Sequence, residues 1–134
     1  NFFNSRNNSG SILKVTTSDI KELMKGMQAL GPKVVVVTDG PLGAYALENG
    51  KIFFMPPYPD PKPPYERTGA VDAFSSTFVA AIALGLSVGD ALRWAPINAM
   101  SVVQYVGARE GLLTKEKIEA YLKQAPQNYV LQEI

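Results

Sequence analysis

The hydrophobic pattern near the start of the chain predicts a helix followed by a buried strand. Apolar residues recur at helical spacing over residues 18–30 and would form one face (Ile20, Leu23, Met24 and Met27). We expect Ser18 or Asp19 to cap this helix and Gly31-Pro32 to end it. The β-branched run at 34–37 is typical of a strand buried on both faces. A helix that turns tightly into such a strand predicts half of a βαβ unit, and therefore an α/β fold with a mainly parallel sheet.

The next part of the chain predicts a β-hairpin and a stiff connector. Two short apolar runs, 43–48 and 51–55, are joined at Asn49-Gly50, which is a strong hairpin signal. Residues 56–64 (PPYPDPKPP) are mostly proline and cannot supply the amide donors of a central strand. They favour an extended connector, with a polyproline II ligand for a recognition module as the alternative.

The C-terminal half of the chain predicts three helices. The first, from 73 to about 84, is apolar nearly all round, which is typical of a buried helix. The second covers residues 88 to about 105 and contains Pro96, which predicts a kink or a break. The third is an amphipathic helix that ends at about 123, and residues 125–134 predict a fraying tail.

Composition limits the class of protein. Residues 1–13 are rich in Asn, Ser and Gly, so we expect a flexible tail, a linker or a truncated end before a domain over residues 14–134. The net charge of +1 gives no electrostatic case for nucleic acid or an acidic membrane. Cysteine and histidine are absent, which excludes disulfides and catalysis by thiol or imidazole. No apolar run reaches the ~18 residues that span a bilayer, so we expect a cytoplasmic protein.

Residues 66–74 (ERTGAVDAF) contain the strongest candidate chemistry. Small residues enter an apolar helix that has one carboxylate, Asp72, in its first turn. Free backbone N–H groups there can face an anion, and Gly69 lets the anion approach without a Cβ in the way. A bound phosphate would repel Asp72, so this carboxylate indicates a base rather than a phosphate ligand. The alternative is an acidic residue that complements the helix dipole.

The run TGAVDAF, with Glu66 ahead of it, resembles the D-T-x-G-A-G-D-A-F signature of the ribokinase-like (PfkB) sugar-kinase family. The flanking order is similar too: a VVVVTDGPLGAY strand and loop, a hairpin and connector, then a helix pair that ends in YVGAREG. The resemblance covers about residues 14–124. It implies a three-layer α/β/α ribokinase-like fold, of which this chain would be the C-terminal, nucleotide-binding portion.

The resemblance also implies an ATP-dependent phosphotransferase that uses Mg²⁺ and moves the γ-phosphoryl group to a hydroxyl of a sugar or nucleoside. Asp72 would be the base, and the N–H groups of Gly69, Ala70, Val71 and Asp72 would form an anion hole. Eight residues would line the nucleotide site (Thr38, Asp39, Gly40, Gly43, Arg67, Asn98, Gly107 and Ala108). Glu66 and Thr68 would hold a monovalent cation such as K⁺. The alternative for Arg67 is an exposed residue at a turn. The alternative for Asn98 is a side-chain amide whose hydrogen bonds are satisfied inside its helix.

Three departures from the family pattern leave other functions open. Val71 stands where the family usually has glycine, and its branched side chain narrows the approach to the γ-phosphate. The N-x-x-E motif that organises Mg²⁺ is absent from residues 1–13, and the sugar-binding half would lie ahead of this chain. The alternatives are a non-catalytic nucleotide-binding module, or an assembly module that pairs with a sugar-binding half or a second copy.

Overall fold

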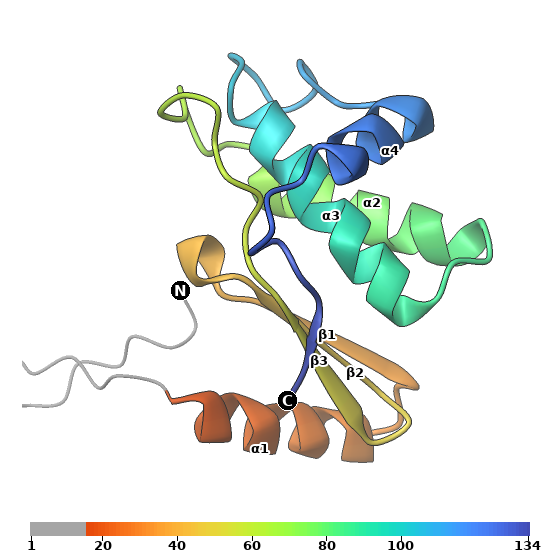
Figure 1. Ribbon diagram of the computed structural model, residues 1–134. Helices are drawn as coiled ribbons and strands as arrows, with labels where there is room; N and C mark the ends of the chain where they lie inside the picture. Colours follow the sequence, from red (N-terminus) through yellow and green to blue (C-terminus); the bar gives the residue numbers. More distant parts are fainter. Residues whose placement is uncertain (1–15) are drawn as a thin grey trace, which may run out of the picture.

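The computed structural model describes residues 16–134, which form one sheet with helices on both faces (Figure 1). The elements are α1 (Thr17–Ala29), β1 (Val34–Thr38), the 3-10 helix η1 (Gly40–Leu42), β2 (Ala44–Glu48), β3 (Lys51–Met55), α2 (Ala70–Ala83), α3 (Val88–Val102), α4 (Lys115–Lys123) and β4 (Gln132–Glu133). The predicted tail at residues 1–13 lies outside the described residues. The predicted helices, first strand and hairpin are confirmed, and α3 continues through Pro96 without a break. No helix in the described part of the chain is long and apolar enough to cross a bilayer.

The sheet has the strand order β1-β2-β3-β4, and every neighbouring pair is antiparallel. Val36 of β1 lies opposite Ala46 of β2, which lies opposite Phe53 of β3. The predicted parallel sheet is therefore not found within residues 16–134. The reason is the length of the connections, because the short loop at 39–43 returns the chain at once, whereas parallel neighbours need a long crossover.

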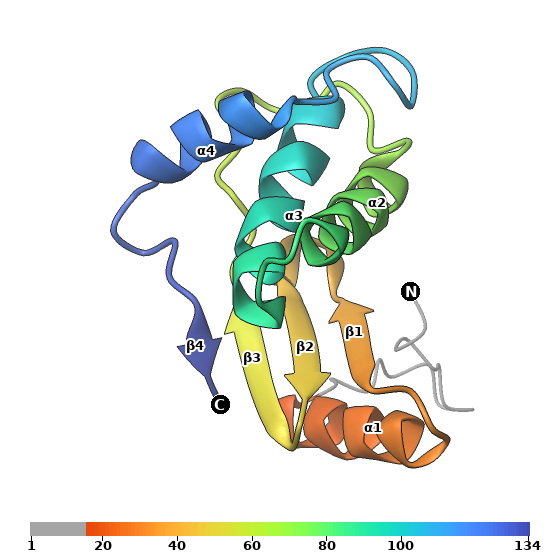
Figure 2. The same ribbon diagram turned by 90° about the vertical axis from the view of Figure 1, so that its right-hand side faces the viewer.

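Two cores lie on opposite faces of this sheet. The two ribbon views show α1 on one side of the sheet and α2 and α3 on the other, which is a three-layer arrangement (Figures 1 and 2). Alternate side chains of a strand point to opposite faces. One set of strand side chains packs with Ile20 and Met24 of α1 (Val35, Val37, Tyr45, Leu47 and Ile52). On the other face, Ala44 and Ala46 of β2 belong to the core formed with α2 and α3. Their small side chains let α3 lie close to the sheet.

The cap of α1 differs from the prediction. Thr16, rather than Ser18 or Asp19, caps the helix: its Oγ1 accepts a hydrogen bond from the Asp19 N–H at 3.2 Å. The Asp19 carboxylate accepts in return from the Thr16 N–H at 2.8 Å, which completes a capping box. The hydrogen bonds from the Thr16 hydroxyl and N–H lower the pKa of Asp19. Leu23 and Met27, predicted to face inward, are partly exposed.

The helix α2 is not buried on most sides, which corrects the prediction from its apolar sequence. One face is buried (Ala73, Phe74, Thr77, Phe78 and Ala81), and the flank beside it exposes apolar side chains (Val71, Val79 and Ile82). Several of these line a groove of about 480 Å³ with Val34 and Val36 of β1. We call this the edge groove, because β1 has no strand beyond it within residues 16–134.

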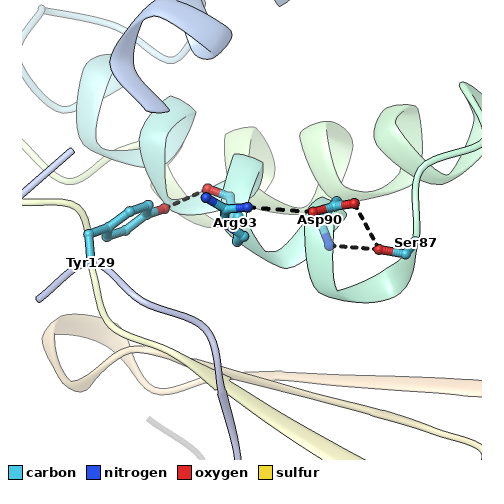
Figure 3. Close-up of polar contacts among 4 residues, drawn as sticks. All are labelled: Ser87, Asp90, Arg93 and Tyr129. Atoms are coloured by element: carbon cyan, nitrogen blue, oxygen red, sulfur yellow. Dashed lines mark hydrogen bonds and ion pairs between the residues drawn. The ribbon is translucent and has the colours of Figure 1, made fainter. Parts of the chain in front are cut away.

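The C-terminal segment is ordered by two contacts instead of fraying. Tyr129 is only 5% exposed, and its hydroxyl donates to the Arg93 carbonyl of α3 at 2.6 Å (Figure 3). The chain then pairs with the sheet edge, where Glu133 lies opposite Phe53. The same figure shows Asp90 between the Ser87 hydroxyl at the helix cap and the Arg93 guanidinium, 3.7 Å away. One buried aromatic side chain therefore fixes a segment that has no periodicity of its own.

We expect Tyr129→Phe to lower the free energy of unfolding by about 0.5–1.5 kcal/mol, because the buried hydroxyl loses its bond to the Arg93 carbonyl. Urea unfolding followed by circular dichroism measures the change. Tyr105→Phe is the control, since Tyr105 is exposed and should change stability little. An unchanged stability of Tyr129→Phe would contradict this role.

The wild type and Tyr129→Phe should also differ in how their stability changes at alkaline pH. Burial raises the pKa of Tyr129 above its ordinary value of 10.0. The contribution of the neutral Tyr129 hydroxyl to the free energy of unfolding is complete below the pKa that this group has in the unfolded chain. It is lost as the pH rises above that pKa, because only the unfolded form then ionises. The stability of the wild type should therefore fall more steeply above pH 10 than that of Tyr129→Phe.

Candidate functional site

The first turn of α2 presents unpaired backbone donors. Gly69 is the N-cap with a left-handed conformation (φ 82°) and no side-chain cap. Within the described residues, the N–H groups of Gly69, Val71 and Asp72 have no hydrogen-bond partner, whereas the Ala70 N–H donates to the Arg67 carbonyl at 3.3 Å. Unpaired N–H groups and the helix dipole together favour an anion at this position.

Gly69 is required for a second reason, because it lies against a distant part of the chain. A Cβ at this position would come within 2.9 Å of the Ala108 Cα. Ala108 belongs to the loop at 104–112 that follows α3, which we call the distal loop. Gly69 thus joins the start of α2 to the distal loop at van der Waals distance.

A cavity of about 440 Å³ extends from the start of α2, which is within the usual size range of small-molecule sites. Its walls come from the loop after β1, the proline-rich connector, the first turn of α2 and the end of α3. Six of the predicted site residues line it (Thr38, Gly40, Gly43, Arg67, Ala70 and Val71). The cavity brings together segments that are far apart in the sequence and reaches the first turn of α2 at Ala70 and Val71, whereas Gly69 and Asp72 are not part of its lining.

The loop after β1 is shaped by its glycines. The Asp39 N–H donates to the Gly43 carbonyl at 2.8 Å and closes the loop around η1. Gly43 has a φ of 119°, and a Cβ there would come within 2.6 Å of the Met55 carbonyl. Thr38 and the two glycines face the cavity, whereas Asp39 is not part of its lining.

Charged groups stand at the start of α2 without internal partners. Asp72 is the third residue of α2 and is exposed, as is Arg67 just before the helix. Neither takes part in an ion pair within residues 16–134. Val71 lies between them, is 62% exposed, and lines both the cavity and the edge groove. The side chain that replaces the expected glycine therefore stands beside the unpaired amides.

Asn98 lies elsewhere, and the geometry does not support its predicted contact with a nucleotide. Its side chain is 6% exposed and outside the cavity lining. The amide donates to Thr77 Oγ1 at 2.8 Å, and its oxygen accepts from the Leu113 N–H at 2.9 Å. Asn98 thus links α2, α3 and the end of the distal loop. Gly107 and Ala108 also lie outside the cavity lining, on the side of Gly69.

The connector supplies cavity residues that the sequence reasoning missed. Four of its residues line the cavity together with Met100 of α3 (Pro57, Tyr58, Pro59 and Asp60). The Tyr58 ring is buried, and its hydroxyl donates to the Tyr121 carbonyl of α4 at 2.9 Å. It also packs edge-on against the rings of Tyr121 and Tyr129. The only sequence feature that could have predicted this cavity wall is the position of the proline run directly ahead of residues 66–74.

Comparison with protein families identifies the chain. The model described as pfkB family carbohydrate kinase matches residues 5–115. The chain belongs to this family. It is 33% identical over 94 residues to a ribokinase of Bacillus subtilis, and 29% identical over 121 residues to a 5-dehydro-2-deoxygluconokinase of Clostridium perfringens. These matches cover 70% and 90% of this chain but only 31% and 35% of the relatives, so the chain spans about a third of their length.

Solved structures share the fold. Arabidopsis thaliana ribokinase complexed with ribose and ATP matches with a TM-score of 0.74 at 28% identity, over 81% of this chain and 35% of that one. A putative ribokinase II from E. coli, solved in complex with ATP and Mg²⁺, matches with a TM-score of 0.68 at 25% identity, over 84% and 34% of the two chains. The described residues therefore have the ribokinase-like fold of about one third of such a kinase.

We expect Gly69→Ala to lower the free energy of unfolding by about 1–3 kcal/mol, because an alanine there is strained and meets Ala108. Gly85→Ala is the matched control, since Gly85 has a similar φ of 89° but open space around it. The difference between the two variants in urea unfolding measures the contact with the distal loop. Equal losses would mean that only backbone strain matters at Gly69.

Proposed function

We propose that this chain is the nucleotide-binding portion of an ATP-dependent kinase that phosphorylates a hydroxyl of a sugar or nucleoside. The observation that carries the proposal is the convergence at the start of α2 of unpaired N–H groups, the exposed Asp72 carboxylate and one end of the cavity. Membership of the pfkB family and the kinase names of the relatives support the same reaction class.

Each part of the site has a role in this reaction. ATP would occupy the cavity with its phosphates toward α2 and its base toward the connector and α3. The N–H groups of Gly69, Val71 and Asp72 would stabilise the charge on the transferring phosphoryl group. Asp72 would take the proton of the acceptor hydroxyl as its oxygen bonds to the γ-phosphorus and the bond to ADP breaks. Arg67 at the cavity would bind a phosphate oxygen.

The predicted K⁺ site at Glu66 and Thr68 stays a prediction, because no contact in the described residues tests it. No group of three or more Asp, Glu, His or Cys residues that could hold a metal ion occurs in the part of the chain that the structure describes. At the predicted K⁺ site, one Glu66 oxygen already accepts a hydrogen bond from the Gly107 N–H, and Thr68 is exposed. The roles assigned above therefore rest on backbone donors, Asp72 and Arg67.

A nucleotide-binding module without catalysis is the second candidate, and Val71 is the observation that favours it. Its side chain stands beside the unpaired amides that would contact the transferring group. A nucleotide could fill the cavity while the γ-phosphate stays out of reach of the N–H groups. The two candidates differ in turnover, not in nucleotide binding.

The edge groove supports a further part of the proposal, which concerns the partner. It combines the free edge of β1 with the exposed apolar face of α2. An unpaired strand beside apolar side chains is a surface for another strand. We propose that the sugar-binding portion of the kinase fold packs here, since the relatives are about three times as long as this chain. A homodimer through the same surface is the alternative.

We expect Asp72→Asn, in a polypeptide that contains the complete kinase fold, to lower kcat by about 10²–10⁴-fold and to leave the Kd for ADP unchanged. Asp90→Asn is the matched control, because Asp90 is likewise the third residue of its helix but lies far along the chain from the site. If both variants keep full turnover, or lose it equally, Asp72 is not the base.

We expect turnover to rise in the order Val71, Val71→Ala, Val71→Gly, by about 10-fold over the series, as the branched side chain is removed from the phosphoryl position. Steady-state kinetics with saturating ATP measures the effect in the complete fold. The alanine variant separates side-chain bulk from the backbone freedom of glycine. Equal kcat values in the three proteins would show that the Val71 side chain does not limit turnover.

A further inference from the structure

The Glu66 carboxylate joins two segments that are remote in the sequence. The Gly107 N–H donates to Glu66 Oε1 at 2.8 Å across 41 positions of the chain. Backbone bonds reinforce the contact, because the N–H groups of Tyr65 and Glu66 donate to the Val103 carbonyl at 2.8 and 3.4 Å. The segment that leads into α2 is thus fastened to the end of α3 and to the distal loop.

The distal loop is otherwise fixed at both of its ends. At its start, Gln104 Nε2 donates to the Lys62 carbonyl at 3.2 Å and to Asp60 Oδ1 at 3.5 Å, and further bonds hold its C-terminal end. The Ser101 hydroxyl donates to the Gly111 carbonyl at 2.7 Å, and the Leu113 N–H donates to Asn98. The residues on either side of Gly107 are exposed. Among the described residues, the side-chain hydrogen bond to the middle of this loop comes from Glu66.

The position of Gly107 matters because its neighbour touches the start of α2. Ala108 lies against Gly69, the N-cap residue that precedes the unpaired amides. A contact that holds Gly107 therefore also holds Ala108 against Gly69. The Gly107 N–H occupies Glu66 Oε1, so a cation at that oxygen would compete with this hydrogen bond.

We propose that Glu66 is a positioning residue: its carboxylate holds the distal loop against the start of α2 through the Gly107 N–H, instead of binding a monovalent cation. The inference deepens the proposed function and rests on it where the proposal concerns the phosphate site. The bond itself depends on the length of the side chain and on its acceptor oxygen, and not on an added ion.

Two substitutions of Glu66 separate these possibilities. Glu66→Gln keeps the length and the acceptor oxygen but removes the charge, so the Gly107 bond should survive. Glu66→Asp keeps the charge but is shorter by one methylene, so the bond should be lost. A cation ligand would show the reverse order, because charge matters more to a cation than to an N–H donor. Glu110→Gln, on the exposed part of the same loop, is the control.

Amide hydrogen exchange of Gly107, measured by NMR with and without KCl, is the first readout. We expect about 10-fold faster exchange in Glu66→Asp and Glu66→Ala, near wild-type exchange in Glu66→Gln and Glu110→Gln, and no effect of KCl. Protection that requires K⁺, or that is lost in Glu66→Gln and kept in Glu66→Asp, would overturn the proposal. Neither result depends on nucleotide binding.

Calorimetric titration with ADP is the second readout. We expect Glu66→Asp to bind ADP several-fold more weakly than the wild type while its midpoint of thermal unfolding changes little, and Glu66→Gln to restore the affinity. Faster Gly107 exchange with unchanged ADP affinity would show a tether without a positioning role. If the wild type binds no ADP, the proposed function fails, and the exchange measurement still decides whether Glu66 holds the loop.

Discussion

The contact between Gly69 and Ala108 determines how the rest of the site is arranged. Gly69 starts α2 in a left-handed conformation that few other residues adopt, and it does so against the backbone of the distal loop. Because no side chain caps the helix, the first-turn N–H groups stay available. The same glycine therefore starts α2, leaves the first-turn N–H groups unpaired and joins α2 to the distal loop.

The cavity follows from how tightly distant segments pack around that helix start. Tyr58 fixes the connector by inserting between Tyr121 and Tyr129, so a proline-rich run without secondary structure becomes a cavity wall. Ala44 and Ala46 admit α3 close to the sheet, which sets the opposite wall. The apolar face of α2 and the free edge of β1 remain uncovered by residues 16–134, as fits one third of a kinase fold.

Much of the fold could be predicted from local patterns. Each of these elements could be predicted from its own residues: the Asn49-Gly50 hairpin, the valine strand and the helices. Two of the predictions that failed concern how segments pack or pair. The segment at 125–134 is ordered by the bond between Tyr129 and Arg93, which no local signal reports. The antiparallel direction of β1 and β2 follows from the short loop between them, which the prediction of a parallel sheet did not take into account.

For the candidate site, the sequence by itself determined the helix start at Gly69, the carboxylate of Asp72 and the glycine loop after β1, because these depend on backbone freedom and residue chemistry. Only the tertiary structure decided which residues share the cavity. It brought in Tyr58 and placed Asn98 in a link among α2, α3 and the distal loop. The type of a residue does not report whether its side chain faces a cavity or a buried neighbour. The packing between remote segments determines which of the two it contacts.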